Sequence, residues 1–163
     1  MTKSWKWLRF GTLLCLLPMA VPGSLAGALH NNLPPDAAEA LRAPEKVVLY
    51  SLEPVAPPGE KTNNFNGYKI LGHVDLVQDQ AVKAIVELKS VVSAWDGVVA
   101  ECFEPRHALR VTAGNHTYDF LLCYECHQLE VYRDGKSIAS LGATGSPKVL
   151  NGLLSAANIP LPR

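Results

Sequence analysis

The clearest pattern of apolar and polar positions predicts a helix in the middle of the chain. Between residues 78 and 95 apolar residues recur at three- and four-residue spacing, which marks one buried face of a helix. Lys83, Glu87 and Lys89 lie mainly on the other side. Gly97 follows, a residue suited to the left-handed conformation that ends many helices. The apolar face comprises Ala81, Val82, Ile85, Leu88, Val92 and Trp95.

Segments rich in β-branched and aromatic residues predict strands on both sides of this helix. Gly114-Asn115 and Asp134-Gly135 predict the tight turns of two hairpins, and Ser146-Pro147 predicts the start of a second helix. The expected fold is α+β: a single, mostly antiparallel sheet in the order β-β-α-β-β-β-α, with two helices packed on one face. The expected strands are 46–52, 68–77, 98–103 with its continuation 107–112, 117–123 with its continuation 128–133, and 136–141.

The first 26 residues predict an export signal that is cleaved after Ala26. Three basic residues precede a short apolar stretch, and small residues occupy the positions that a signal peptidase reads. An uncleaved membrane anchor is the alternative. We expect a periplasmic or secreted protein without a transmembrane span after cleavage, with residues 27–45 as a flexible lead and residues 46–160 as one domain. Within the lead, the sequence permits a short helix turn from Asp36 to Arg42 that Pro44 stops.

Charge restricts the class of partner. An apolar fraction of 48% is typical of a globular chain. Removing residues 1–26 leaves 12 basic and 15 acidic residues, a net charge of about −3. Nucleic acids and anionic membranes attract basic surfaces, so neither is expected as a partner. A protein partner remains open.

The candidate chemistry lies between Cys102 and His127. This stretch holds every cysteine outside the signal: Cys102, Cys123 and Cys126. An oxidising compartment favours one disulfide, which leaves one thiol over. A hairpin that turns at Gly114-Asn115 brings Cys102 beside Cys126. The first expectation is therefore a Cys102–Cys126 disulfide with Cys123 buried and free, and Cys102–Cys123 is the second.

The same residues permit cofactor chemistry. Cys123-x-x-Cys126-His127 is the attachment motif of c-type haem, although its flanks read as strand and no methionine follows the signal. Cys102, His107, Cys123 and Cys126 form a Cys₃His set that suits zinc or Cu(I). A thioredoxin-like redox pair is disfavoured because its first cysteine needs a helix N-terminus. The favoured interpretation is a protein without a cofactor, and no catalytic residue is assigned.

Two sequence blocks carry a family resemblance. Cys102-Phe103-x-Pro105-Arg106-His107 and Leu122-Cys123-Tyr124-Glu125-Cys126 resemble the paired blocks of a set of small exported bacterial proteins of unknown function. Phe65-x-Gly67-Tyr68-x-Ile70-Leu71-Gly72 matches that set as well, whereas Ala108 stands where the set often has glycine. The resemblance covers most of residues 46–160. It implies export and the fold outline, makes the three cysteines part of the scaffold's signature, and implies no activity.

Arg106 and His107 form a candidate anion site. The alternative is that Arg106 pairs with Glu104 or Glu125 across the hairpin while His107 is structural. The expected function is therefore an exported, disulfide-stabilised structural or interaction module without catalytic activity. The alternatives are a Cys/His metal-binding protein or a c-type haem protein.

Overall fold

The structure is a computed structural model that describes residues 32–54 and 64–162. The predicted export signal, residues 1–26, and the start of the predicted lead lie outside the described residues. Among the helices within these two ranges, none is long and apolar enough to cross a membrane.

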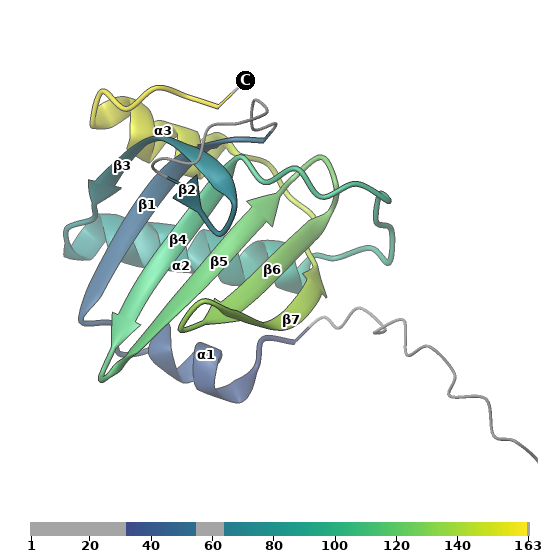
Figure 1. The fold of residues 1–163 in the computed structure, drawn as a ribbon, viewed down its shortest axis with the longest axis horizontal. Helices are drawn as coiled ribbons and strands as arrows, with labels where there is room; N and C mark the ends of the chain where they lie inside the picture. The colour runs from purple at the N-terminus through teal and green to yellow at the C-terminus, as the bar shows by residue number, and fades with distance from the viewer. Residues whose placement is uncertain (1–31, 55–63, 163) are drawn as a thin grey trace, which may run out of the picture.

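Within the described residues, a seven-stranded sheet forms the centre of the fold (Figure 1). The strands lie in the order β2-β3-β1-β4-β5-β6-β7, and every neighbouring pair is antiparallel. With its helices, this sheet confirms the α+β class. The strands are β1 (Lys46–Glu53), β2 (Asn64–Phe65), β3 (Tyr68–Asp75), β4 (His107–Ala113), β5 (His116–Cys123), β6 (Gln128–Arg133) and β7 (Lys136–Gly142).

Three helices accompany the sheet in the described part of the chain: α1 (Pro35–Ala40), α2 (Gln78–Ser93) and α3 (Lys148–Ala156). Their buried residues join alternate residues of the strands in one hydrophobic core. Figure 1 shows α2 crossing behind the sheet, with α1 and α3 near opposite ends of the strands. Alternation of apolar residues along β1, β4, β5 and β6 supplies the other half of this core, since successive strand residues face opposite sides.

The element order differs from the prediction. Helix α1 and the short strand β2 were not in the expected order, and four strands rather than three follow α2. Helix α1 falls in the stretch predicted as a flexible lead, yet Ala37, Ala40 and Leu41 are buried in the core. The ordered fold therefore begins before residue 46.

The predicted strand 98–103 is wrong. Residues 98–106 contain no strand, and Val98 and Val99 are exposed. The Asp96 carboxylate accepts a hydrogen bond from the Val98 amide, and the Trp95 indole donates one to the Val98 carbonyl. These local contacts hold a turn directly after α2. Val98 and Val99 therefore pair with no strand and remain exposed.

The predicted hairpins are confirmed. β4 and β5 pair from Ala113–His116 at the turn to His107–Leu122 at the far end, around Gly114-Asn115 as expected. The β6–β7 turn places Asp134 and Gly135 at φ of 50° and 75°. Two successive left-handed residues match the right-handed twist of the flanking strands, which is why Asp-Gly favours this turn.

Candidate functional site

A disulfide closes the turn between β5 and β6. Cys123 ends β5, residues 124–127 form the turn, and Cys126 bonds to Cys123 with a Cα–Cα distance of 5.1 Å. His127 then adopts a left-handed φ of 55° and leads into β6. The chain therefore reverses within the Cys-x-x-Cys motif.

This pairing corrects both expected ones. Cys102 bonds to neither partner and is an exposed free thiol. The expectation treated residues 123–126 as regular strand, in which residues three apart point to opposite faces. A turn at Tyr124 and Glu125 instead brings the two sulfurs together, and the β4–β5 ladder ends at His107 before it reaches Cys102.

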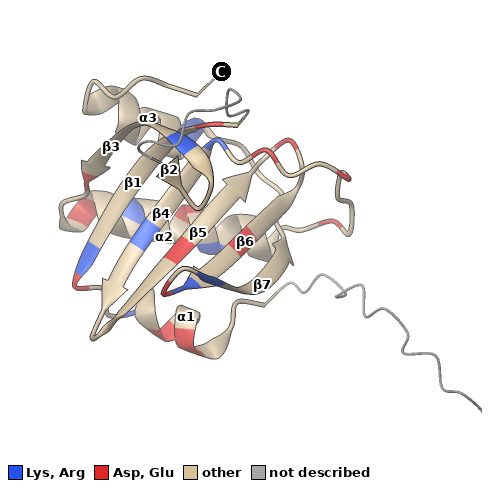
Figure 2. Cartoon of the chain, viewed as in Figure 1, with Lys and Arg blue, Asp and Glu red and all other residues tan. Residues whose placement is uncertain are grey.

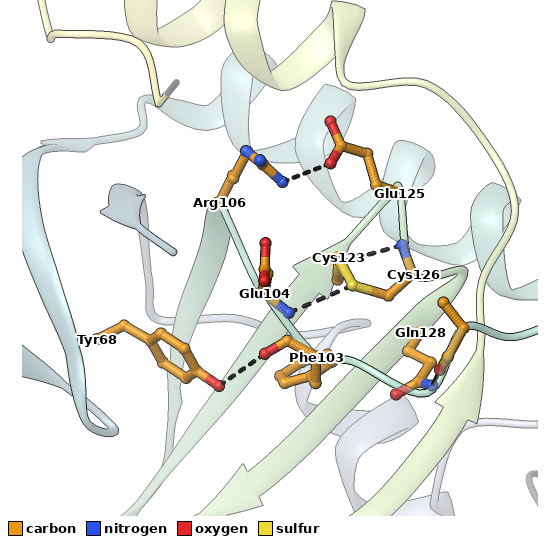
Figure 3. The surroundings of a disulfide bond; sticks show 9 residues. Tyr68, Phe103, Glu104, Arg106, Cys123, Glu125, Cys126 and Gln128 are labelled. Carbon is orange, nitrogen blue, oxygen red and sulfur yellow. Dashed lines mark hydrogen bonds and ion pairs between the residues drawn. A yellow bond between two sulfur atoms is a disulfide. The ribbon is translucent and has the colours of Figure 1, made fainter. Parts of the chain in front are cut away.

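Both sulfurs of the disulfide are enclosed. Cys123 and Cys126 are 2% and 1% exposed. The Cys123 sulfur accepts a hydrogen bond from the Cys126 amide at 3.1 Å, and the Cys126 sulfur accepts one from the Glu104 amide at 3.3 Å (Figure 3). A further hydrogen bond ties the loop before β4 to this turn: the Ala100 amide donates to the Cys126 carbonyl at 2.9 Å.

A small cavity lies beside the disulfide. It has a volume of about 230 Å³ and is lined from the start of β4, the β5–β6 turn and the residues before α3. We call it the His107 cavity. Its lining residues are Arg106, His107, Tyr124, Glu125 and the segment 145–147. The fold thus brings together residues about forty positions apart in the sequence.

Arg106 and Glu125 form the charged rim of this cavity. The guanidinium donates to the Glu125 carboxylate at 2.9 Å, and Figure 3 shows the two side chains pointing toward one another. Of the two carboxylates predicted as alternatives, Glu104 and Glu125, the one that pairs with Arg106 is Glu125. Its side chain is 73% exposed, whereas that of Arg106 is 24% exposed. The pair is screened by solvent on the carboxylate side and adds little to stability.

His107 lines the same cavity from below the surface. The side chain is 2% exposed, and its Nε2 lies 2.7 Å from the Asn151 amide oxygen on α3. An amide oxygen only accepts hydrogen bonds, so Nε2 carries the proton and Nδ1 presents a lone pair. Nδ1 is buried and has no hydrogen-bond partner among the described residues. Burial lowers the pKa of His107 to about 4, which keeps the imidazole neutral at neutral pH.

Tyr124 packs its ring against that imidazole. The ring centroids are 5.7 Å apart in an edge-on arrangement, and the phenol oxygen lies 3.4 Å from the Glu87 carboxylate. Burial, followed by the neighbouring Glu87 charge, raises the pKa of Tyr124. The phenol therefore stays protonated and acts as a wall of the cavity rather than as a base.

The residues considered for cofactors do not form a ligand set in this structure. Cys123 and Cys126 share a disulfide, so in this state neither supplies the thioether of a c-type haem or the thiolate of a zinc site. His127 Nδ1 lies 3.6 Å from the Asp96 carboxylate, an ion-pair distance. Within the described ranges, no group of three or more His, Cys, Asp or Glu side chains is placed to hold a metal ion.

A partly buried ion pair on the opposite face of the sheet was not predicted. Asp119 is 2% exposed and accepts two hydrogen bonds from Arg110, at 2.7 and 2.8 Å, and one from Asn66 at 2.8 Å. The guanidinium lies 4.6 Å from the Phe65 ring centroid. These contacts fasten the β2–β3 hairpin to the sheet. A charged residue inside the apolar run of β5 was the signal for this cluster in the sequence.

Comparisons with protein-family models, curated proteins and solved structures give no match for this chain.

Proposed function

We propose that this chain is an exported binding module whose disulfide is structural and which performs no catalysis of its own. The observation that carries the proposal is the enclosure of the Cys123–Cys126 disulfide, whose sulfurs are nearly inaccessible and accept backbone amide hydrogen bonds. Catalytic and redox-sensing cysteines need thiolate character and access to a partner. Buried, hydrogen-bonded sulfurs favour a structural role.

The location of the disulfide supports a scaffolding role. The bond closes the turn that carries Tyr124 and Glu125, two of the residues around the His107 cavity. A covalent closure of the β5–β6 turn fixes these side chains relative to Arg106 on the neighbouring segment. The disulfide therefore preorganises a surface, which lowers the entropic cost of binding.

The distribution of charge supports a partner other than nucleic acid. On the face shown in Figure 2, acidic and basic residues are interspersed along the strands and helices. Excess negative charge after removal of the predicted signal points the same way. We infer a small-molecule or protein partner that is recognised by shape and by a few polar contacts.

The test is the intact mass of the protein purified from the exporting cell without reductant, before and after alkylation. We expect an N-terminus at Gly27, one alkylated thiol at Cys102, and a mass two hydrogens below that of the reduced chain. A haem-sized increment that survives denaturation would replace the proposal with electron transfer. Three alkylated thiols, with metal lost on unfolding, would replace it with a Cys/His metal site.

A further inference from the structure

We propose that the outward face of α2 pairs two copies of this chain, with the two α2 helices antiparallel about a two-fold axis. The inference concerns self-association and does not depend on the proposed binding role. It draws on two exposed valines of α2, on the groove beside them, and on two unpaired charges of opposite sign at equal distances from the valines.

Two large apolar side chains of α2 lie outside the hydrophobic core. Val82 and Val86 are 55% and 60% exposed, although the sequence pattern placed Val82 on the buried face of the helix. They are about one helical turn apart and therefore lie on the same side of α2. Valine is a weaker helix former than most residues of exposed helix surfaces, so helix formation alone does not account for the two exposed valines.

A groove runs beside these valines. Its volume is about 960 Å³, and α2 forms one wall, with Val82 and Val86 among the lining residues. Residues 41–47, which connect α1 to β1, and the end of β3 supply the rest of the lining. Lys46 and Asp75 on that side already pair with each other at 2.8 Å. With the groove, the two valines form a continuous apolar surface rather than isolated apolar residues, and such surfaces mark contacts with other molecules.

Two unpaired charges flank the valines on the same face of α2. Asp79 precedes Val82 by three positions, and Lys89 follows Val86 by three positions. At about 100° per residue, these four side chains fall within an arc of about 80°, and Lys83 lies outside it. Within the described residues, neither the Asp79 nor the Lys89 side chain makes a hydrogen bond or an ion pair.

This pattern complements itself when the helix is reversed. If a second α2 lies antiparallel, with the axis at the level of Ala84, Val82 meets Val86 of the second copy and Asp79 meets Lys89 of the second copy. The two-fold axis makes each contact twice. A parallel pair would instead bring like charges together, which is unfavourable. Charge complementarity therefore selects a second copy of this chain in the antiparallel orientation.

The experiment is sedimentation velocity of the oxidised mature protein, alkylated at Cys102 so that no intermolecular disulfide forms. We expect a reversible equilibrium of monomer and dimer between about 1 and 500 μM, because the apolar centre of the contact is small. Asp79→Lys sets lysine against lysine across the axis, and Lys89→Asp sets aspartate against aspartate. Each single variant should therefore dimerise at least about tenfold more weakly than the parent chain.

Mixing the two single variants restores opposite charges across the contact. An equimolar mixture of Asp79→Lys and Lys89→Asp should form heterodimers with about the affinity of the parent chain, and the double variant should form homodimers again. Recovery in the mixture also shows that each variant is folded. Lys136→Asp is the matched control, because Lys136 is an exposed lysine on β7 that does not line the groove, and it should leave dimerisation unchanged.

Three results would overturn the proposal: a parent chain that stays monomeric at the highest concentration, single variants that dimerise as tightly as the parent chain, or a mixture that associates no more tightly than its components. None of these bears on the proposed function, which is tested by the number of alkylatable thiols. A monomeric chain with one alkylatable thiol remains a binding module, and the α2 face would then belong to a different partner.

Discussion

His107 makes the folded state sensitive to acid. Its pKa is about 4 in the fold, mainly because the ring is desolvated, against 6.5 for an ordinary histidine. The folded state therefore favours the neutral ring, and this contribution is complete above pH 6.5 and is lost as the pH falls from 6.5 to 4. Each pH unit in that window removes about 1.4 kcal/mol, so the free energy of unfolding should fall by about 3 kcal/mol.

Urea unfolding at several pH values between 7 and 4 measures this loss. His107→Gln should flatten the dependence because glutamine does not titrate. His73→Gln is the matched control: His73 is an exposed histidine on β3 and should leave the slope unchanged. If the His107→Gln chain and the parent chain lost stability in parallel, the acid sensitivity would belong to other groups.

At the scale of the element, the β5–β6 connection shows where the sequence pattern was sufficient and where it was not. The register of the β4–β5 hairpin followed from Gly114-Asn115, because a two-residue turn fixes which strand residues pair. The Cys123–Cys126 bond did not follow, because Tyr124 and Glu125 carry no turn signal such as glycine or proline. The residue of that turn with a positive φ is His127, and histidine is not among the usual turn-forming residues.

Removing the disulfide should loosen this one connection rather than unfold the protein. For a loop closed over a sequence separation of 3, the chain-entropy estimate is about 2 kcal/mol. The free energy of unfolding of the Cys123→Ala/Cys126→Ala double variant should therefore be about 2 kcal/mol lower, so that it unfolds at a lower urea concentration. Cys102→Ala, which removes an exposed free thiol, should change the free energy of unfolding by less than about 0.5 kcal/mol. Equal stability of all three chains would remove the structural role of the disulfide.

At the scale of the whole molecule, patterns that repeat over many residues were predicted, and contacts between distant segments were not. The amphipathic spacing of α2 and the alternation of β6 identify themselves locally. The His107 cavity requires Arg106, Tyr124 and Ser146 to meet, which depends on sheet order and on the path of the chain into α3. The sequence offered Arg106 and His107 as an anion site but contained no signal that residues 145–147, just before α3, would line the same cavity.

Helix α1 provides the last test, because it decides where the folded unit begins. Ala37, Ala40 and Leu41 are nearly fully buried, and Asp36 accepts a hydrogen bond from Arg133 at 3.2 Å. Burial of these three apolar side chains contributes about 3 kcal/mol. A chain that starts at residue 46 should therefore unfold at markedly lower temperature than one that starts at residue 27.

A chain that starts at residue 32 is the matched control for that truncation, since it keeps α1 and the three buried side chains. Its melting temperature should equal that of the chain from residue 27. Arg133→Gln should reproduce only a small part of the loss, because the Asp36–Arg133 pair is partly exposed and screened. If the chain from residue 46 melted with the others, α1 would be an appendage and the core would be complete in residues 46–160.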